Sequence, residues 1–352
     1  DGLTGTEKFF KFLGPVHDVI MAMGDIFALL VLVSVAIFLI RRLFMNIKRF
    51  TGIEMKKKSH IDAIISLSLI LVLMISLLAM NTGYVNYKAL EAKNQYGVYP
   101  VSEIIAGLMP EWTTESFYRL YQISWWFHIL TIFFFANYLP YSKHFHVFMA
   151  IPNVFLSRLE PLGKLYNMEN VTREVRIMMN PETAYSSSPA DAPPERFGVK
   201  DVEDVTWKNY FESLSCTECG RCTSACPANI TGKKLSPRKI MMNLRARMKE
   251  KGPLMIKYGR DYSDNKSLVR NYITEEELWA CTTCNACAQE CPVNINQPSL
   301  IIDMRRYLVM EEGSAPGELK AVFSNIENNE APWQYSPEDR LNWAKGLELN
   351  IN

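Results

Sequence analysis

Eight cysteines, the entire thiol content of this 352-residue chain, occur in two copies of one spacing pattern. Each copy reads C-x2-C-x2-C-x3-C-P, with Pro227 or Pro292 directly after the last cysteine. The eight positions are Cys216, Cys219, Cys222, Cys226, Cys281, Cys284, Cys287 and Cys291. Three thiolates so close together can wrap three corners of a metal cluster from one tight loop, while a fourth ligand comes from elsewhere. The pattern therefore predicts thiolate-bound metal clusters.

The spacing is that of sites that hold two [4Fe–4S] cubanes, in which the fourth cysteine of each run ligates the other cluster. For the first cluster we therefore expect the ligands Cys216, Cys219, Cys222 and Cys291. For the second cluster we expect the ligands Cys281, Cys284, Cys287 and Cys226. Such clusters carry single electrons, so the chain is predicted to transfer electrons.

Two other uses of these cysteines remain as alternatives. A disulfide framework needs an oxidising compartment and is typical of small secreted domains. Structural zinc typically uses two C-x2-C pairs per site, without a third cysteine at the same spacing or a following proline. No cysteine is left for a plant-type [2Fe–2S] site, so two cubanes are the preferred interpretation.

Long apolar runs dominate residues 1–165, whereas residues 195–352 are mixed and charged. About 20 apolar residues are needed to cross ~30 Å of hydrocarbon. Trp125 and Trp126 open one such run, as aromatic residues do at a membrane interface. Three segments meet this length, at residues 19–40, 61–80 and about 120–139. The sequence therefore predicts a multi-pass transmembrane domain over residues 1–165.

The charges of the connecting loops predict the orientation of this domain. The loop between the first two spans carries seven Lys and Arg and the single acid Glu54, whereas residues 81–119 carry three basic and four acidic residues. Basic loops stay in the cytoplasm, so the first loop and everything after the third span are expected there. We therefore predict a protein of the bacterial inner membrane with its cluster domain in the reducing cytoplasm, which suits thiolate ligands.

The N-terminus and the overall charge add two further expectations. The predicted topology places Asp1 outside, yet residues 1–18 contain no secretory signal. The native polypeptide is therefore expected to begin earlier, with at least one more membrane helix; a short translocated tail is the alternative. The net charge of +1 gives no sign of nucleic-acid binding.

Histidines in the apolar half are candidate haem ligands, because ionisable residues are rare in membrane spans. His128 and His146 lie 18 residues apart, which in one continuous helix places them on the same face, about 27 Å apart. Two such imidazoles suit axial ligation of one or two b-type haems. Pro140 between them should kink the helix, which makes His144 a competitor for the inner position. The remaining axial ligands are expected from His17, His60 or an upstream helix, although both histidines also suit a polar interface.

The charged half is predicted to be entirely helical. Residues 166–199 read as a Pro- and Ser-rich linker, and residues 200–312 as the two-cluster domain. Ser236 is a candidate N-cap, and Thr274 begins a candidate capping box. Helices are expected at residues 237–249, 264–279 and 299–311.

The last segment, residues 313–352, is expected to serve as a docking tail. It carries Trp333 and Trp343 in a polar stretch interrupted by proline. A disordered end is the alternative.

Both halves of the chain resemble known proteins. The third span with His128, followed by Lys143-His144-Phe145-His146, resembles the di-haem membrane domain of nitrate reductase gamma subunits and the cytochrome subunit of membrane-bound heterodisulfide reductase. Residues 200–343 are similar to the dicluster subunits of heterodisulfide reductase and of anaerobic glycerol-3-phosphate dehydrogenase. The whole chain resembles bacterial fused proteins known as iron–sulfur-binding oxidoreductases. Two features depart from these families: there are fewer spans, and no cysteine-rich CCG domain follows Cys291.

The resemblance implies a mainly α fold, with a cytochrome b-like transmembrane helical domain followed by an all-helical dicluster ferredoxin domain. It also implies an electron-transfer subunit of a quinone-linked oxidoreductase, which passes electrons between a cytoplasmic partner, two [4Fe–4S] clusters, haem b and the quinone pool. The partner is expected to be a separate CCG-domain iron–sulfur subunit or a flavoprotein, and the catalytic site is expected on that partner chain. A wire subunit of a heterodisulfide-reductase-like or dehydrogenase complex, and a structural membrane anchor, remain alternatives.

Overall fold

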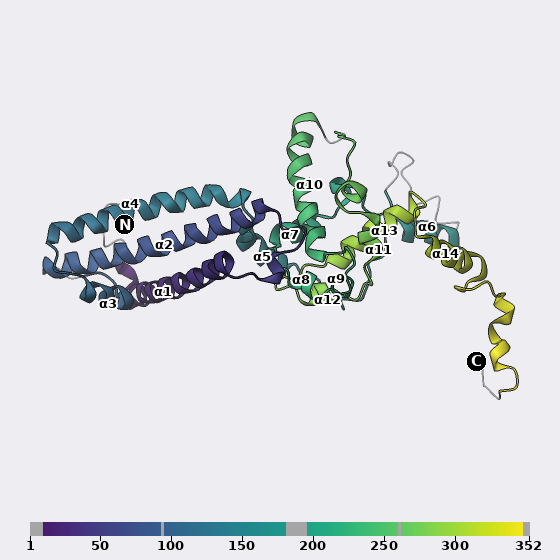
Figure 1. Ribbon diagram of the computed structural model, residues 1–352, viewed down its shortest axis with the longest axis horizontal. Coiled ribbons are helices and arrows are strands. Elements are labelled where there is room, and N and C mark those ends of the chain that lie inside the picture. Colours follow the sequence, from purple (N-terminus) through teal and green to yellow (C-terminus); the bar gives the residue numbers. More distant parts are fainter. Residues whose placement is uncertain (1–9, 93–94, 181–195, 260–261, 348–352) are drawn as a thin grey trace. The chain divides into compact units, whose positions relative to one another are not determined.

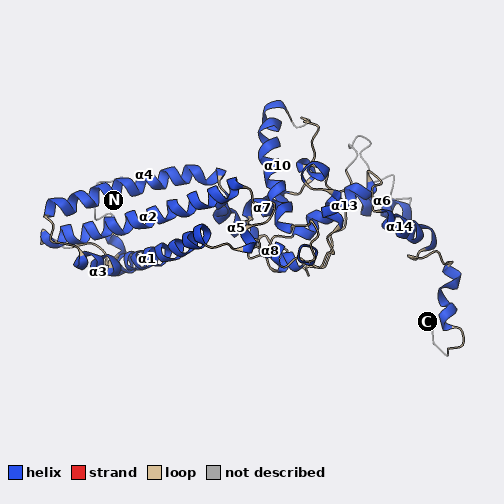
Figure 2. Ribbon diagram, in the orientation of Figure 1, coloured by secondary structure: helices blue, strands red, loops and turns tan. Residues whose placement is uncertain are grey.

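The computed structural model describes residues 10–92, 95–180, 196–259 and 262–347, and within these ranges the regular structure is helical (Figures 1 and 2). The described residues contain no β-sheet, only an isolated bridge between Val269 and Ile273. The expectation of a mainly α fold is therefore confirmed. The chain forms two compact units: an apolar-helix unit of residues 1–152 with 214–220, and a cluster unit of residues 153–213 with 221–352.

The apolar-helix unit is built around its longest helix, α2. Helices α1, α3 and α4 all contact α2, and Figure 1 shows α1 and α4 running along its sides. A Cβ atom on Gly83 of α2 would lie 2.9 Å from the backbone nitrogen of Tyr121, so the glycine lets α2 and α4 approach closely. The helices are α1 (Pro15–Phe44), α2 (Lys57–Leu90), α3 (Pro100–Leu108), α4 (Thr114–Tyr138) and α5 (His146–Phe155).

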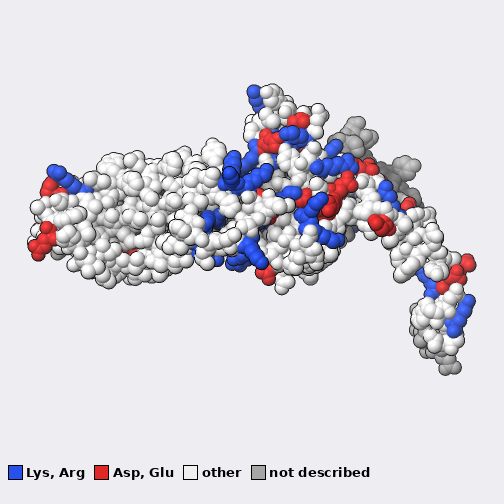
Figure 3. All heavy atoms as spheres, in the orientation of Figure 1, with Lys and Arg blue, Asp and Glu red and all other residues white. Residues whose placement is uncertain are grey.

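Two of these helices, α1 and α2, are long and apolar enough to cross a membrane. Only 22% and 28% of the residues in their most apolar stretches are buried, whereas a core helix of a soluble protein is mostly buried. Figure 3 shows the matching surface, with few charges between the ends of this unit. The third expected span lies in α4, which does not reach the same mean hydropathy because it contains Trp125, Trp126, His128 and Asn137. Membrane association is thus supported by two helices, and a third span stays a prediction.

The helix that was expected to carry both His128 and His146 is interrupted. Helix α4 ends at Tyr138, and α5 begins only at His146. Between them lie two short 3₁₀ turns, Leu139–Tyr141 and Lys143–Phe145. Pro140 cannot donate a backbone hydrogen bond, and Ser142 is extended and caps the second turn by accepting a hydrogen bond from the His144 N–H at 3.0 Å. The expectation of one continuous helix face, about 27 Å long, is therefore wrong.

A buried carboxylate ties α3 to the long helices. Asp25 of α1 is 1% exposed and accepts hydrogen bonds from the N–H groups of Val101 and Ser102 at 2.8 and 2.9 Å. The Ser102 hydroxyl and the Asn81 amide donate two more, at 2.6 and 3.1 Å. These contacts satisfy orphan amides at the start of α3, so Asp25 has a structural role.

The cluster unit is assembled from short helices around the longer α10 and α13. Ser236 accepts a hydrogen bond from the Lys239 N–H, and Thr274 forms a capping box with Glu277, so both expected caps are confirmed. The helix expected at 264–279 is largely wrong, because only Glu275–Trp279 is regular α-helix and Arg270 before it has a φ of 75°. The helices are α6 (Glu169–Met179), α7 (Trp207–Ser215), α8 (Arg221–Ser224), α9 (Pro227–Ile230), α10 (Pro237–Tyr258), α11 (Glu275–Trp279), α12 (Ala286–Gln289), α13 (Gln297–Met310) and α14 (Gly317–Asn329).

The expected linker and domain boundaries stay predictions. Helix α6 lies inside the segment 166–199 that was expected to be a linker, and residues 181–195 lie outside the described residues.

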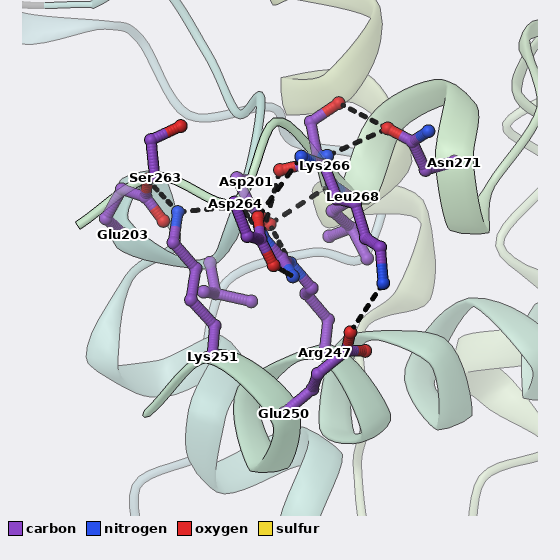
Figure 4. A network of polar contacts seen from close by, with 12 residues as sticks. Asp201, Glu203, Arg247, Glu250, Lys251, Ser263, Asp264, Lys266, Leu268 and Asn271 are labelled. Carbon is purple, nitrogen blue, oxygen red and sulfur yellow. Dashed lines mark hydrogen bonds and ion pairs between the residues drawn. The ribbon is translucent and has the colours of Figure 1, made fainter. Parts of the chain in front are cut away.

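A buried ion network fastens α10 to the rest of the cluster unit (Figure 4). The Arg247 side chain is fully buried and donates to Asp201 at 2.7 Å and to Asp264 at 2.6 Å. Lys251, one turn further along α10, donates to Asp201 at 2.9 Å. The Leu268 N–H donates to the same carboxylate at 3.1 Å. Each buried charge has an opposite charge and several hydrogen bonds, which offset the cost of its desolvation. The network can therefore join three segments of the chain.

Candidate iron–sulfur centres

The two cysteine runs fold into the same local turn. Glu218 and Thr283 occupy matching positions and have φ angles of 58° and 54°. Two residues later, Gly220 and Asn285 again match, with φ angles of 77° and 60°. A short helix follows in each copy, α8 or α12, and contains the third cysteine. The repeated sequence pattern therefore produces a repeated backbone, in which left-handed residues turn the chain sharply between the cysteines.

Within the cluster unit, the structure brings together Cys226, Cys281, Cys284 and Cys287. Burial raises the pKa of the Cys287 thiol to about 12, and the neighbouring thiols of Cys281, Cys226 and Cys284 raise it further. Burial also raises the pKa of Cys281, with smaller contributions from Cys226 and Cys284. Thiols that lie close together, with Cys226 and Cys287 buried, resist ionisation unless a cation replaces their protons. These four cysteines are the set predicted for the second cluster, and their role as ligands stays a prediction.

Arg305 of α13 supports the second cysteine loop, and sequence reasoning did not assign it this role. Its guanidinium donates to the carbonyl of Leu278 at 2.6 Å and to that of Cys281 at 2.5 Å, and it stacks over Trp279. Its charge also opposes the rise in the pKa of Cys281. The Thr283 N–H adds a hydrogen bond to the Cys281 sulfur at 3.4 Å. Hydrogen bonds and charges at the sulfurs are the protein's means of tuning a cluster's potential.

The first half of the first run, with Cys216 and Cys219, belongs to the apolar-helix unit. Glu218 is 6% exposed there and accepts hydrogen bonds from the Ser59 hydroxyl and from the Lys143 ammonium, the latter at 3.1 Å. Lys143 also donates to the Ser59 carbonyl at 2.6 Å. Burial lowers the pKa of Lys143, and the Glu218 charge opposes that change. We call this contact of Glu218, Lys143 and Ser59 the loop anchor.

The eight cysteines fit two cubanes better than the alternatives. None of them forms a disulfide. Among the described residues, no group of three or more His, Cys, Asp or Glu side chains is arranged to hold a single metal ion. A cubane requires a wider arrangement, because each thiolate binds a different iron atom. The assignment of all eight ligands stays a prediction, with Cys222 and Cys291 in the cluster unit.

The histidines are held by local contacts and do not stack along one helix. The Ser76 hydroxyl donates to the Leu73 carbonyl at 2.9 Å and lies 2.8 Å from His128 Nδ1, from which it can accept. The tautomer that fits this arrangement has its proton on Nδ1 and its lone pair on Nε2, as in a metal-bound imidazole. His146 Nδ1 lies 3.0 Å from the Lys143 carbonyl, and its ring centroid is 5.3 Å from that of His144.

Comparison with known proteins supports the iron–sulfur assignment. Residues 215–295 match the 4Fe-4S dicluster domain family. The probable iron–sulfur-binding oxidoreductase FadF of Bacillus subtilis is 33% identical over 255 residues, which cover 64% of this chain and 33% of the relative. The EtfAB:quinone oxidoreductase of Syntrophomonas wolfei is 29% identical over 274 residues, covering 72% of this chain and 35% of the relative. A probable membrane-anchored ferredoxin of Chromohalobacter salexigens is 33% identical over 185 residues, which cover 46% of this chain and 26% of the relative.

These matches extend well beyond the dicluster domain, but the chain spans only about a third of the length of the curated relatives it matches. No solved structure matches the chain. The chain therefore contains a 4Fe-4S dicluster domain over residues 215–295, and it is similar to iron–sulfur oxidoreductases and electron-transfer subunits.

Proposed function

We propose that this chain is the membrane-anchored electron-transfer part of a quinone-linked oxidoreductase. Cys216, Cys219, Cys222 and Cys291 hold one [4Fe–4S] cluster in this proposal, and Cys281, Cys284, Cys287 and Cys226 hold the other. The clusters supply one-electron redox chemistry when bound. The residues of the chain position them, cover them and tune their potentials.

The loop anchor is the observation that carries this proposal. A structural anchor whose clusters only stabilise a soluble fold has no need to place a cluster loop among apolar helices. Here the loop with Cys216 and Cys219 is held by a buried ion pair to Lys143, in the second 3₁₀ turn after α4, and by Ser59 at the start of α2. The second loop instead leaves Cys284 exposed to solvent. This difference supports a route from a water-soluble partner, through the second cluster and then the first, toward the membrane, or in reverse.

A b-type haem is the expected acceptor within the apolar helices. His128 is the leading ligand, because its hydrogen bond to Ser76 presents Nε2 as the metal-binding nitrogen. His146 is the second candidate ligand of one or two haems. The other axial ligands are expected to be His144, His17, His60 or a residue outside this sequence. When bound, haem supplies a one-electron carrier at membrane depth.

The partners follow from the same arrangement and from the relatives. We expect the bacterial inner membrane, a cluster domain facing the cytoplasm, and a catalytic site on a partner chain. A relative described as an EtfAB:quinone oxidoreductase favours a flavoprotein donor and quinone as acceptor. A separate iron–sulfur subunit with a CCG domain is the other expected donor.

Purification from native membranes tests the proposal. Mass spectrometry should find a flavoprotein or iron–sulfur subunit bound, and electron paramagnetic resonance should detect two [4Fe–4S] signals. A pyridine-haemochrome assay should detect haem b, and His128→Ala should abolish one haem signal. The cluster signals of the same variant act as an internal control, since all cluster ligands lie elsewhere. Zinc in place of iron, or protein without any redox partner or haem, would reject the proposal.

A further inference from the structure

The cluster unit contains a cavity of about 810 Å³ beside the second cysteine loop. Its volume lies within the ordinary range for small-molecule sites, about 300–1,000 Å³. Ala288 and Gln289 of α12 form part of the wall, and Cys287 precedes them in the same short helix. The opposite wall includes Trp207, Lys208 and Glu212 of α7. The cavity therefore lies within a few residues of a predicted cluster ligand.

A buried carboxyl group faces this cavity without a full set of partners. Glu212 is 3% exposed, and its Oε1 accepts a hydrogen bond from the Asn296 N–H at 3.3 Å. Its Oε2 has no hydrogen-bond partner among the described residues. Burial raises the pKa of Glu212 to about 7, although Lys208, the Asn296 N–H and Asn209 oppose this rise. A buried carboxyl group of this kind keeps a proton available near neutral pH.

The remaining charges of the cavity largely neutralise one another. Arg158 donates to Glu160 at 3.0 Å, and Arg306 donates to Asp303 at 2.9 Å. Burial lowers the pKa of Lys208, whose ammonium donates to the carbonyl and side-chain oxygens of Asn153 at 2.9 and 2.6 Å. A nucleotide or another phosphate-bearing ligand would need an excess of cations. With Glu212 protonated, the lining carries three cations, Arg158, Lys208 and Arg306, against the two carboxylates Glu160 and Asp303. One cation in excess is few for a polyphosphate, so a neutral ligand fits the cavity better.

Apolar and aromatic side chains complete the lining. Trp207 is 59% exposed, so its ring is available for stacking a flat ligand. Tyr166 is 52% exposed, and the Arg158 guanidinium covers one of its faces at 4.1 Å. Leu156 and Leu162 are also exposed and lie in the segment that directly follows α5. An exposed apolar path of this kind suits a hydrocarbon tail attached to the ring.

We propose that this cavity binds the headgroup of a quinone. The ring stacks against Trp207, one ring oxygen accepts a hydrogen bond from Glu212, and the tail leaves along Leu156 and Leu162. This inference rests on the proposed function, which names quinone as the acceptor, and adds a site for it outside the apolar helices. Reduction of a quinone to a quinol adds two electrons and two protons. The reduced clusters would be the electron source, Glu212 would give one proton to a ring oxygen, and water at the cavity mouth would give the other.

Photolabelling of the full-length protein in detergent tests the site. An aryl-azide derivative of a naphthoquinone is cross-linked by light, and the labelled peptides are identified by mass spectrometry. The expected label falls in residues 156–168 or 206–212, and unlabelled naphthoquinone should compete with it. Labelling confined to residues 10–152 would overturn the site. Because label position is read without turnover, a failure of electron transfer, which counts against the proposed function, stays distinct from labelling elsewhere.

Variants of the cavity sharpen the test. Glu212→Ala should weaken naphthoquinone binding about tenfold, since it removes one buried hydrogen bond. Glu212→Gln keeps an N–H donor and should bind within about threefold of the wild type. Trp207→Ala should weaken binding about fivefold through lost stacking. The exposed Glu318 of α14 provides the matched control, because Glu318→Ala should change nothing. Iron and labile-sulfide content verifies folding; equal affinity of folded Trp207→Ala and wild-type protein would contradict the proposal.

Discussion

The two cysteine loops have the same backbone turn and different surroundings. In the first loop, the left-handed residue directly before the second cysteine is Glu218, which is buried in the loop anchor. Its counterpart in the second loop is Thr283, which is exposed and contacts only its own loop. At the first position of the pattern Cys216 is buried and Cys281 is half-buried, and at the second position Cys219 is half-buried and Cys284 is exposed. Identical ligand spacing thus coexists with one covered and one accessible loop.

This difference teaches that the cluster motif determines ligation, while its surroundings determine which way electrons can enter. Burial and nearby charge set the reduction potential of a cluster. Glu218 places a negative charge and Lys143 a positive charge near the first cluster, and Arg305 places a positive charge near the second. Two clusters in such unlike surroundings are expected to have distinct potentials, which gives the transfer a direction.

The largest effect on the clusters is expected from replacing either of the two crossed ligands. Cys226→Ser should remove the cluster held by the second loop, and Cys291→Ser should remove the one held by the first, because each supplies the fourth thiolate of the distant site. Electron paramagnetic resonance of the reduced proteins should show one cluster signal lost in each variant, and a different one. If each variant lost the cluster of its own run, the crossed arrangement would be wrong.

Breaking the ion network of the cluster unit should destabilise that unit by about 3–5 kcal/mol, since Arg247→Met removes the cation that pairs with Asp264 and one of the two cations that pair with the buried Asp201. Hydrogen bonds from Arg247 hold the pKa of Asp264 below its ordinary value, and those from Arg247 and Lys251 outweigh burial to lower that of Asp201. Their stabilisation is therefore present above the unfolded pKa of about 3.9 and is lost as the pH falls through the lower folded values.

Denaturant titration followed by cluster absorbance measures this effect at several pH values. Arg247→Met should also make the free energy of unfolding depend less on pH in the acid range. The exposed pair Lys234–Glu276 is the control, and Lys234→Met should leave the unfolding midpoint almost unchanged. An equal loss of stability in both variants would show that the buried network contributes no more than an exposed ion pair.

A reciprocal exchange between the loops tests the role of the loop anchor. Glu218→Thr removes a buried negative charge, so the reduction potential of the first cluster should rise by tens of millivolts. Thr283→Glu adds an exposed charge, which solvent screens, so the second potential should fall by less. Redox titration monitored by electron paramagnetic resonance reads both clusters in each variant. Shifts of equal size would mean that the two surroundings are electrostatically alike.

The smallest effect on the clusters is expected from the tail. Trp333 and Trp343 are 66% and 69% exposed, as expected of aromatic anchors for a partner. Deleting residues 328–352 should release the cytoplasmic subunit while both cluster signals persist, because the ligands end at Cys291. Co-purification and quantitative mass spectrometry measure the bound subunit. Retention of the full amount of partner would show that docking lies elsewhere.

Much of this protein follows from its sequence alone, where the cause is local. The cysteine spacing predicted the repeated turn, because three of the four cysteines proposed for each cluster lie within seven residues of one another. Ser236 and Thr274 predicted two helix starts correctly, since a cap contacts amides only three residues away. The apolar runs likewise predicted α1 and α2, whose hydropathy needs no tertiary contact.

Other features were decided only by the tertiary structure. Glu218 and Lys143 lie 75 positions apart, and Arg305 lies 24 positions from Cys281, whose carbonyl it contacts. No local sequence pattern predicts either contact. The sequence around Glu212 does not distinguish it from an exposed helix residue. Only the fold of the cluster unit buries it beside the cavity. The break after Tyr138 overturned a phase calculation that assumed one helix. Spacing within a run determines which atoms can bind iron, but the environment of those atoms depends on which distant segments fold against them.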